Sequence, residues 1–117
     1  MSQGQPTLVI ISEDPRASHR ANEAMRIALG IVAGHNPVSI VLTGPAVHLL
    51  DENTDDLVDG DDIAKFRASL KKLGVPFHVE GELPAARDWN AEGHPIVPVG
   101  RGEIGALVPK ATRFLVF

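Results

Sequence analysis

His78 and Glu80 are the two side chains whose types and spacing in this sequence suggest acid/base chemistry. They lie two residues apart in a predicted strand, so both point to the same face of a sheet. An imidazole beside a carboxylate can move protons, but a general base also needs a third group that orients it, and the sequence offers none. The alternative is a half-buried histidine that hydrogen-bonds to the backbone.

A second set of candidate residues follows the predicted strands. In an open parallel α/β sheet, ligands bind beyond the carboxyl ends of the strands, where helix N-termini present free amides. The arginines of this set could attract an anion, although surface arginines commonly do no more than interact with water. The predicted ligand-binding residues are Ser12, Asp14, Arg16, Thr43, Gly44, Glu80, Gly81, Gly100 and Arg101.

Two further motifs match known sites only in part. Residues 100–105 fit the pattern G-x-G-x-x-G, but the twelve residues that follow are too few for the next strand and acidic residue of a dinucleotide site. The acidic segment 51–62 partly resembles the calcium-binding loop of an EF-hand, but Leu57 and Phe66 stand where that loop requires oxygen ligands. We therefore expect a strand-to-helix turn and a solvated loop, with no metal and no cofactor.

Composition narrows the class of protein. The 117 residues predict one domain over 1–117, and a formal net charge of −4 without a Lys/Arg cluster argues against binding to nucleic acid. The apolar run 8–11 is too short for a signal peptide, so we expect a cytoplasmic protein that does not enter a membrane. There is no cysteine, which excludes disulfides, thiolate zinc sites and cysteine-based catalysis.

Apolar runs and helix signals predict the elements that position these residues. The expected strands lie near residues 7–12, 38–43, 75–80, 95–99 and 112–117. The expected helices run from Asp14–Pro15 to Ala33, from Gly44–Pro45 to Leu50, from an N-cap at Asp61 or Asp62 to Leu73, from Leu83 to Ala91, and from Gly102 to Lys110. Strands alternating with helices predict a three-layer α/β/α fold around a five-stranded parallel sheet.

The first long helix is apolar over more than the usual face. Its apolar residues are Ala24, Met25, Ala28, Leu29, Ile31 and Val32. A small sheet cannot cover that much apolar surface, and exposed patches of this kind commonly mark interfaces. We therefore expect a homo-oligomer.

Several segments together resemble a known family. They are Asp14–Arg16, Arg26–Gly30, Val41–Gly44 with Ala46–Val47, and Phe114–Phe117. In this order and spacing the sequence resembles the DsrE/DsrF-like family, which includes sulfur-relay subunits. The resemblance implies a five-stranded parallel sheet between helix layers and assembly as trimers or hexamers, with a further protein partner as an option.

The sequence departs from this family at one position. Catalytic members carry sulfur as a persulfide on a cysteine just after the third strand, a task that needs a thiolate. The alignment puts Glu80 at that position, with Leu83 as the other candidate. The resemblance therefore implies a non-catalytic oligomeric subunit, an interaction or scaffold protein without sulfurtransferase activity. Two alternatives stay open: a module that binds a small anionic ligand at the strand ends, and an acid/base enzyme using Glu80 and His78.

Overall fold

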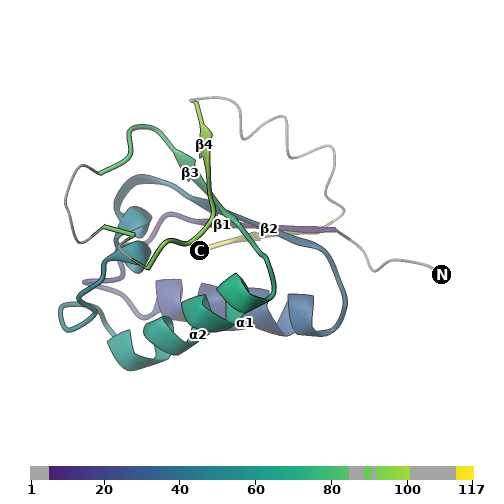
Figure 1. Ribbon diagram of the computed structural model, residues 1–117, viewed down its shortest axis with the longest axis horizontal. Helices are drawn as coiled ribbons and strands as arrows, with labels where there is room; N and C mark the ends of the chain where they lie inside the picture. The colour runs from purple at the N-terminus through teal and green to yellow at the C-terminus, as the bar shows by residue number, and fades with distance from the viewer. Residues whose placement is uncertain (1–5, 85–88, 91, 101–112) are drawn as a thin grey trace.

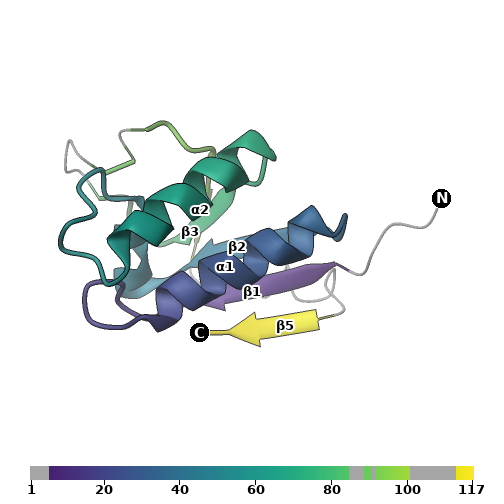
Figure 2. The same cartoon turned by 90° about the horizontal axis from the view of Figure 1, so that it is seen from below.

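All five expected strands lie in one parallel sheet (Figures 1 and 2). The computed structural model describes residues 6–84, 89–90, 92–100 and 113–117. The strands are β1 (Thr7–Ile11), β2 (Val38–Leu42), β3 (Phe77–Glu80), β4 (Ile96–Val99) and β5 (Arg113–Val116), in the spatial order β4-β3-β2-β1-β5. Every neighbouring pair is parallel. The predicted α/β fold with a five-stranded parallel sheet is confirmed.

Strands β1 and β2 form the centre of the sheet because their apolar, largely β-branched residues suit a strand that is buried on both faces. Val9 and Ile40 point to one face and are fully buried. Leu8 and Val41 point to the other face and are also buried. Both faces are therefore covered at the centre of the sheet, as the predicted fold requires.

Two long helices cover one face of the sheet. Figure 2 shows α1 (Arg20–Ala33) and α2 (Gly60–Lys72) side by side in front of the strands. Ala24, Met25 and Ala28 of α1 are buried against the sheet and α2. The broad apolar stripe of α1 is thus packed within one chain, so the expected exposed patch on this helix is not present, and the homo-oligomer stays a prediction. The predicted helix over 102–110 lies outside the described residues.

The helix predicted from Asp14–Pro15 in fact begins at Arg20, so this prediction was wrong. The Asp14 carboxylate accepts a hydrogen bond from the Arg16 amide at 2.9 Å and closes a local turn instead of capping a helix. The Pro15 carbonyl accepts a hydrogen bond from the Val58 amide at 2.7 Å, which ties this turn to the acidic loop. That long-range bond competes with helix formation at this point.

Helix α2, by contrast, begins earlier than expected. Its N-cap is Asp59, with a left-handed φ of 57°, so Asp61 and Asp62 lie in the first turn. The short helix η1 (Gly44–Leu50) forms as predicted, as a 3-10 helix. Gly74 ends α2 with φ of 74°, also as predicted.

The helix predicted over Leu83–Ala91 is contradicted at its described ends. Leu83 and Pro84 are irregular, and residues 85–88 and 91 lie outside the described part. Trp89 forms an isolated antiparallel bridge with Asp51, and its indole Nε1 donates to the Val47 carbonyl at 2.8 Å. At Trp89, pairing with the residue that follows η1 takes the place of the expected helix. Within the described residues, no helix is long and apolar enough to cross a membrane.

Replacing Gly60 with alanine tests how closely the acidic loop approaches α2. A methyl group at Gly60 would lie 2.1 Å from the Thr54 carbonyl oxygen, whereas nothing lies within 4 Å of the same position at Gly30 of α1. We expect Gly60→Ala to lower the free energy of unfolding by about 1–3 kcal/mol, because the backbone must shift. Gly30→Ala, the control, should raise it by about 0.5–1 kcal/mol through helix propensity. Equal effects in urea denaturation would contradict the close approach.

Candidate functional site

The carboxyl ends of the strands bring most of the predicted ligand-binding residues to one edge of the sheet. The Thr43 amide donates to the Ile11 carbonyl at 3.0 Å, and the Gly81 amide donates to the Val99 carbonyl at 3.1 Å. Gly100 directly follows β4, next to Val99. These residues therefore share an edge as the sequence predicts, while their role in binding stays a prediction. Arg101 lies outside the described residues.

Ser12, at this edge, forms two hydrogen bonds with the residue that follows β5. Its amide donates to the Phe117 carbonyl at 2.7 Å, and its hydroxyl donates to the same oxygen at 3.0 Å. The amides of Ser12, Thr43 and Gly81 are therefore used within the sheet. A ligand at this edge could therefore not bind these three amides without breaking hydrogen bonds of the sheet.

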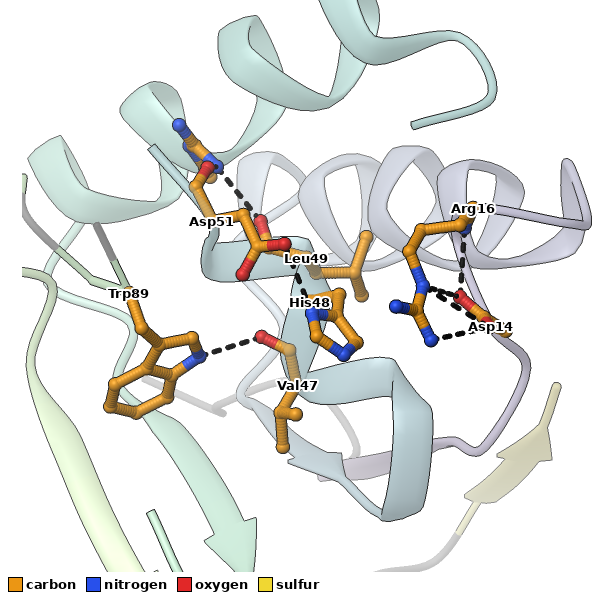
Figure 3. Close-up of polar contacts among 8 residues, drawn as sticks. Asp14, Arg16, Val47, His48, Leu49, Asp51 and Trp89 are labelled. Atoms are coloured by element: carbon orange, nitrogen blue, oxygen red, sulfur yellow. Dashed lines mark hydrogen bonds and ion pairs between the residues drawn. The ribbon is translucent and has the colours of Figure 1, made fainter. Parts of the chain in front are cut away.

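Arg16 and Asp14 form an ion pair in the loop after β1 (Figure 3). The Arg16 Nε lies 3.0 Å from Asp14 Oδ1, and one terminal nitrogen lies 3.0 Å from Oδ2. The hydrogen bond from the Arg16 guanidinium holds the pKa of Asp14 below its ordinary value. An anion that approached Arg16 would have to compete with this carboxylate.

His48 and Asp51 form a second polar pair beside the first (Figure 3). The His48 Nδ1 lies 3.0 Å from Asp51 Oδ2, and both side chains are partly buried. The charges of His48 and Asp51 act on Asp14 and Arg16 respectively, so the four groups form one electrostatic cluster. Sequence reasoning did not single out this pair. Its spacing of three residues, from the short helix η1 to the residue that caps it, was the available signal.

His78 and Glu80 share a face of β3, but they do not form a catalytic pair in the described structure. The His78 Nδ1 lies 3.3 Å from the Ile40 carbonyl oxygen, and the ring is half-buried. In the sheet register His78 lies between Val41 and Val97. This matches the alternative of a histidine bound to the backbone. Among the described residues no third group orients either side chain.

Two cavities among the described residues lie away from these candidates. One, of about 400 Å³, is lined by the loop before α2, including Asp55, Asp59 and Asp61. The other, of about 320 Å³, lies at the end of α1 beside His35 and Pro37. Within the described part of the chain, no cluster of three or more His, Asp or Glu side chains is arranged to hold a metal ion.

Comparison with known proteins gives one family and one fold. The model of the DsrE/DsrF-like family matches residues 5–117. Among solved structures, the chain is similar to the crystal structure of the ychN protein from E. coli, with a TM-score of 0.71 over 97% of this chain and 99% of that chain. The sequence identity is 15%, so this likeness shows the fold alone. No curated protein matches the chain.

Replacing Arg16 with glutamine tests the ion pair at the strand edge. In Arg16→Gln the pKa of Asp14 should rise toward its ordinary value, because the charge and the paired hydrogen bonds of the guanidinium are gone. Carboxyl carbon shifts in an NMR pH titration report this value directly. The control is Arg20→Gln, which removes an arginine that makes no ion pair in the described residues. It should leave the pKa of Asp14 unchanged. If the pKa of Asp14 in Arg16→Gln equals that of the native protein, the ion pair between Asp14 and Arg16 does not form in solution.

Proposed function

The chain belongs to the DsrE/DsrF-like family, and from this membership we propose that it is a non-catalytic, oligomeric subunit without sulfurtransferase activity. The observation that carries the proposal is the absence of cysteine from all 117 residues. A persulfide forms on a thiolate, and a carboxylate cannot form or release an S–S bond. Such a chain acts through the surfaces that it presents to other subunits.

The position of Glu80 supports this assignment. Glu80 is the last residue of β3, where the resemblance puts the sulfur-carrying cysteine. The backbone that would present a thiol is formed by regular pairing with β4, in which Glu80 lies beside Val99. The family scaffold is thus kept at this point, and the reactive side chain is different.

Exposed apolar side chains support an assembly of several subunits. In the monomer Phe114 and Val116 on the edge strand β5 are 48% and 64% exposed, and Val97 on the opposite edge strand is 39% exposed. In the sheet register Phe114 pairs with Leu8, so these side chains stand on the face opposite α1 and α2. We assign the subunit interface to this face and propose a trimer or hexamer, with a protein partner as a further option.

The two other candidate functions have less support. A module for small anionic ligands would use Arg16, whose guanidinium is already paired with Asp14. An acid/base enzyme would use His78 and Glu80, which share no hydrogen bond in the described structure. Neither has an observation that favours it over an interaction subunit.

Sedimentation velocity at micromolar concentration tests the assembly. The native chain should sediment as a trimer or hexamer. Val116→Lys should shift it toward the monomer, because a lysine would be buried unpaired at the proposed interface. The control Leu73→Lys changes a side chain that is 52% exposed at the end of α2 and should leave the assembly intact. A native monomer would contradict the proposal.

Restoring the thiol tests the catalytic half of the proposal. After incubation with a small-molecule persulfide donor, Glu80→Cys should gain one sulfur atom by mass spectrometry, because the scaffold is kept and only the nucleophile is supplied. The native protein should gain none. Uptake by Leu83→Cys but not by Glu80→Cys would show that the cysteine position aligns with Leu83. Uptake by neither would show that the site itself is not retained, and uptake by the native chain would refute the assignment.

A further inference from the structure

The described structure holds a buried polar cluster away from the strand ends, formed by Arg67, Glu92 and His94. Arg67 lies in α2, and the other two lie in the segment that leads into β4. The side chains of Arg67 and His94 are each 1% exposed, and that of Glu92 is 41% exposed. Neither the strand-end residues nor the proposed interface includes this cluster.

Arg67 joins three parts of the chain. One terminal nitrogen donates to the carbonyls of Leu49 and Asp51 at the end of η1, at 3.0 and 2.5 Å. The other donates to Glu92 Oε1 at 2.5 Å. Lys71, one turn further along α2, donates to the Glu92 carbonyl. The segment before β4 is therefore held to α2 mainly through Glu92.

His94 lies on the inner side of Glu92. Its Nε2 is 3.2 Å from Glu92 Oε2, while its Nδ1 is buried and has no hydrogen-bond partner among the described residues. The ring meets the edge of Phe77 at the start of β3, with centroids 5.9 Å apart. Asn90 fixes the backbone, because its side chain bonds both the amide and the carbonyl of His94. The neutral form, with the proton on Nε2, fits these contacts.

A second proton on His94 does not fit the same contacts. Among the described residues the buried Nδ1–H would meet no acceptor, and an unpaired buried donor is costly. The charged groups that face His94 are Glu92 on its own segment and the cations Arg67 and Lys71 on α2. The single carboxylate already binds Arg67, so a protonated His94 would add a third cation to one anion.

We propose that the cluster of Arg67, Glu92 and His94 is a pH-sensitive attachment: protonation of His94 releases residues 89–90 and 92–95 from α2 and η1 while the rest of the fold remains. The proton can reach water only if His94 leaves Phe77, and that movement draws Glu92 away from Arg67. The contacts of Trp89 and Asn90 with η1 belong to the same segment and are lost with it. Release would uncover the start of β3.

The direction of the pH dependence follows from the burial of His94. Burial lowers the pKa of His94 below its ordinary value of 6.5, and Glu92 only partly opposes this. The released state therefore binds protons more readily than the attached state. The attachment is complete above pH 6.5 and is lost as the pH falls through the lower, folded-state pKa. Burial is the largest single influence on Glu92 and would raise its pKa, but the hydrogen bonds and charges of Arg67 and His94 together lower it, so Glu92 stays charged in this window.

Trp89, the single tryptophan of the chain, reports on the segment directly. In the native protein its emission should shift to longer wavelength in one transition centred below pH 6.5, as the indole leaves the Val47 carbonyl for water. Far-UV circular dichroism should stay constant over the same range. Hydrogen–deuterium exchange at the imidazole C2 position, read by mass spectrometry, should give His94 a pKa equal to the midpoint of the emission change.

Two variants distinguish the effect of His94 protonation on Trp89 emission from the effect of His48. His94→Gln should abolish the emission change, because glutamine can donate to Glu92 without titrating. His48→Gln, which alters the histidine next to Val47, should keep it. The proposal is overturned if emission is constant between pH 7.5 and 5, if it moves together with the circular dichroism, or if His48→Gln removes the change. If His94→Gln does not fold, a mismatch between the exchange-derived pKa of His94 and the native emission midpoint overturns it instead.

Discussion

The buried guanidinium of Arg67 is the constraint on which the structure outside the sheet depends. A charge that is 1% exposed must have its donors satisfied by nearby oxygen atoms, or its burial costs several kcal/mol. Carbonyls at the end of η1 and the carboxylate of Glu92 supply oxygens for its two terminal nitrogens, whereas Nε has no hydrogen-bond partner among the described residues. Arg67 thereby fixes where the short helix after β2 must end and where the chain must pass on its way to β4. Three segments that share no regular secondary structure are joined at one side chain.

The strand ends illustrate how a family scaffold can be kept while its chemistry changes. Parallel pairing alone places Ser12, Thr43, Glu80 and Gly81 along one edge, whatever their side chains are. Sulfur transfer needs one further thing at that edge, a thiolate, and this chain has none. The polar groups that do occupy the edge bind each other: Asp14 holds Arg16, and Asp51 holds His48. That mutual pairing occupies the charges of these four groups.

The sequence was informative where a local pattern determines the structure. The continuous apolar run of β2 predicted a buried strand, which is present. The apolar stripe of α1 predicted an exposed patch, but this stripe is packed against the sheet and α2. Predictions failed where another residue forms a hydrogen bond with a group that the local sequence assigns to a helix end. Asp14 has the features of an N-cap, but Arg16 uses its carboxylate and Val58 binds the next carbonyl. Arg67 lies in a helix rich in charged residues, so nothing in the local pattern distinguishes it from a solvent-exposed arginine. The location of the candidate site could be predicted, because the topology of the sheet determines where the strands end. The ion pairs within the site could not be predicted, because they depend on the geometry of the loops.

The pairing of β5 with β1 has a consequence for how the chain is made. The Ser12 hydroxyl and the Phe117 carbonyl are 105 residues apart in sequence, and their hydrogen bond extends the pairing on the outer side of β1. Strands β1 to β3 and the two long helices can associate as they leave the ribosome, whereas β1 keeps an open apolar edge until the last strand is synthesised. Translation therefore produces an interval in which Leu8 and Ile10 belong to an unfinished sheet. Any chaperone that protects nascent chains of this fold would act within that interval.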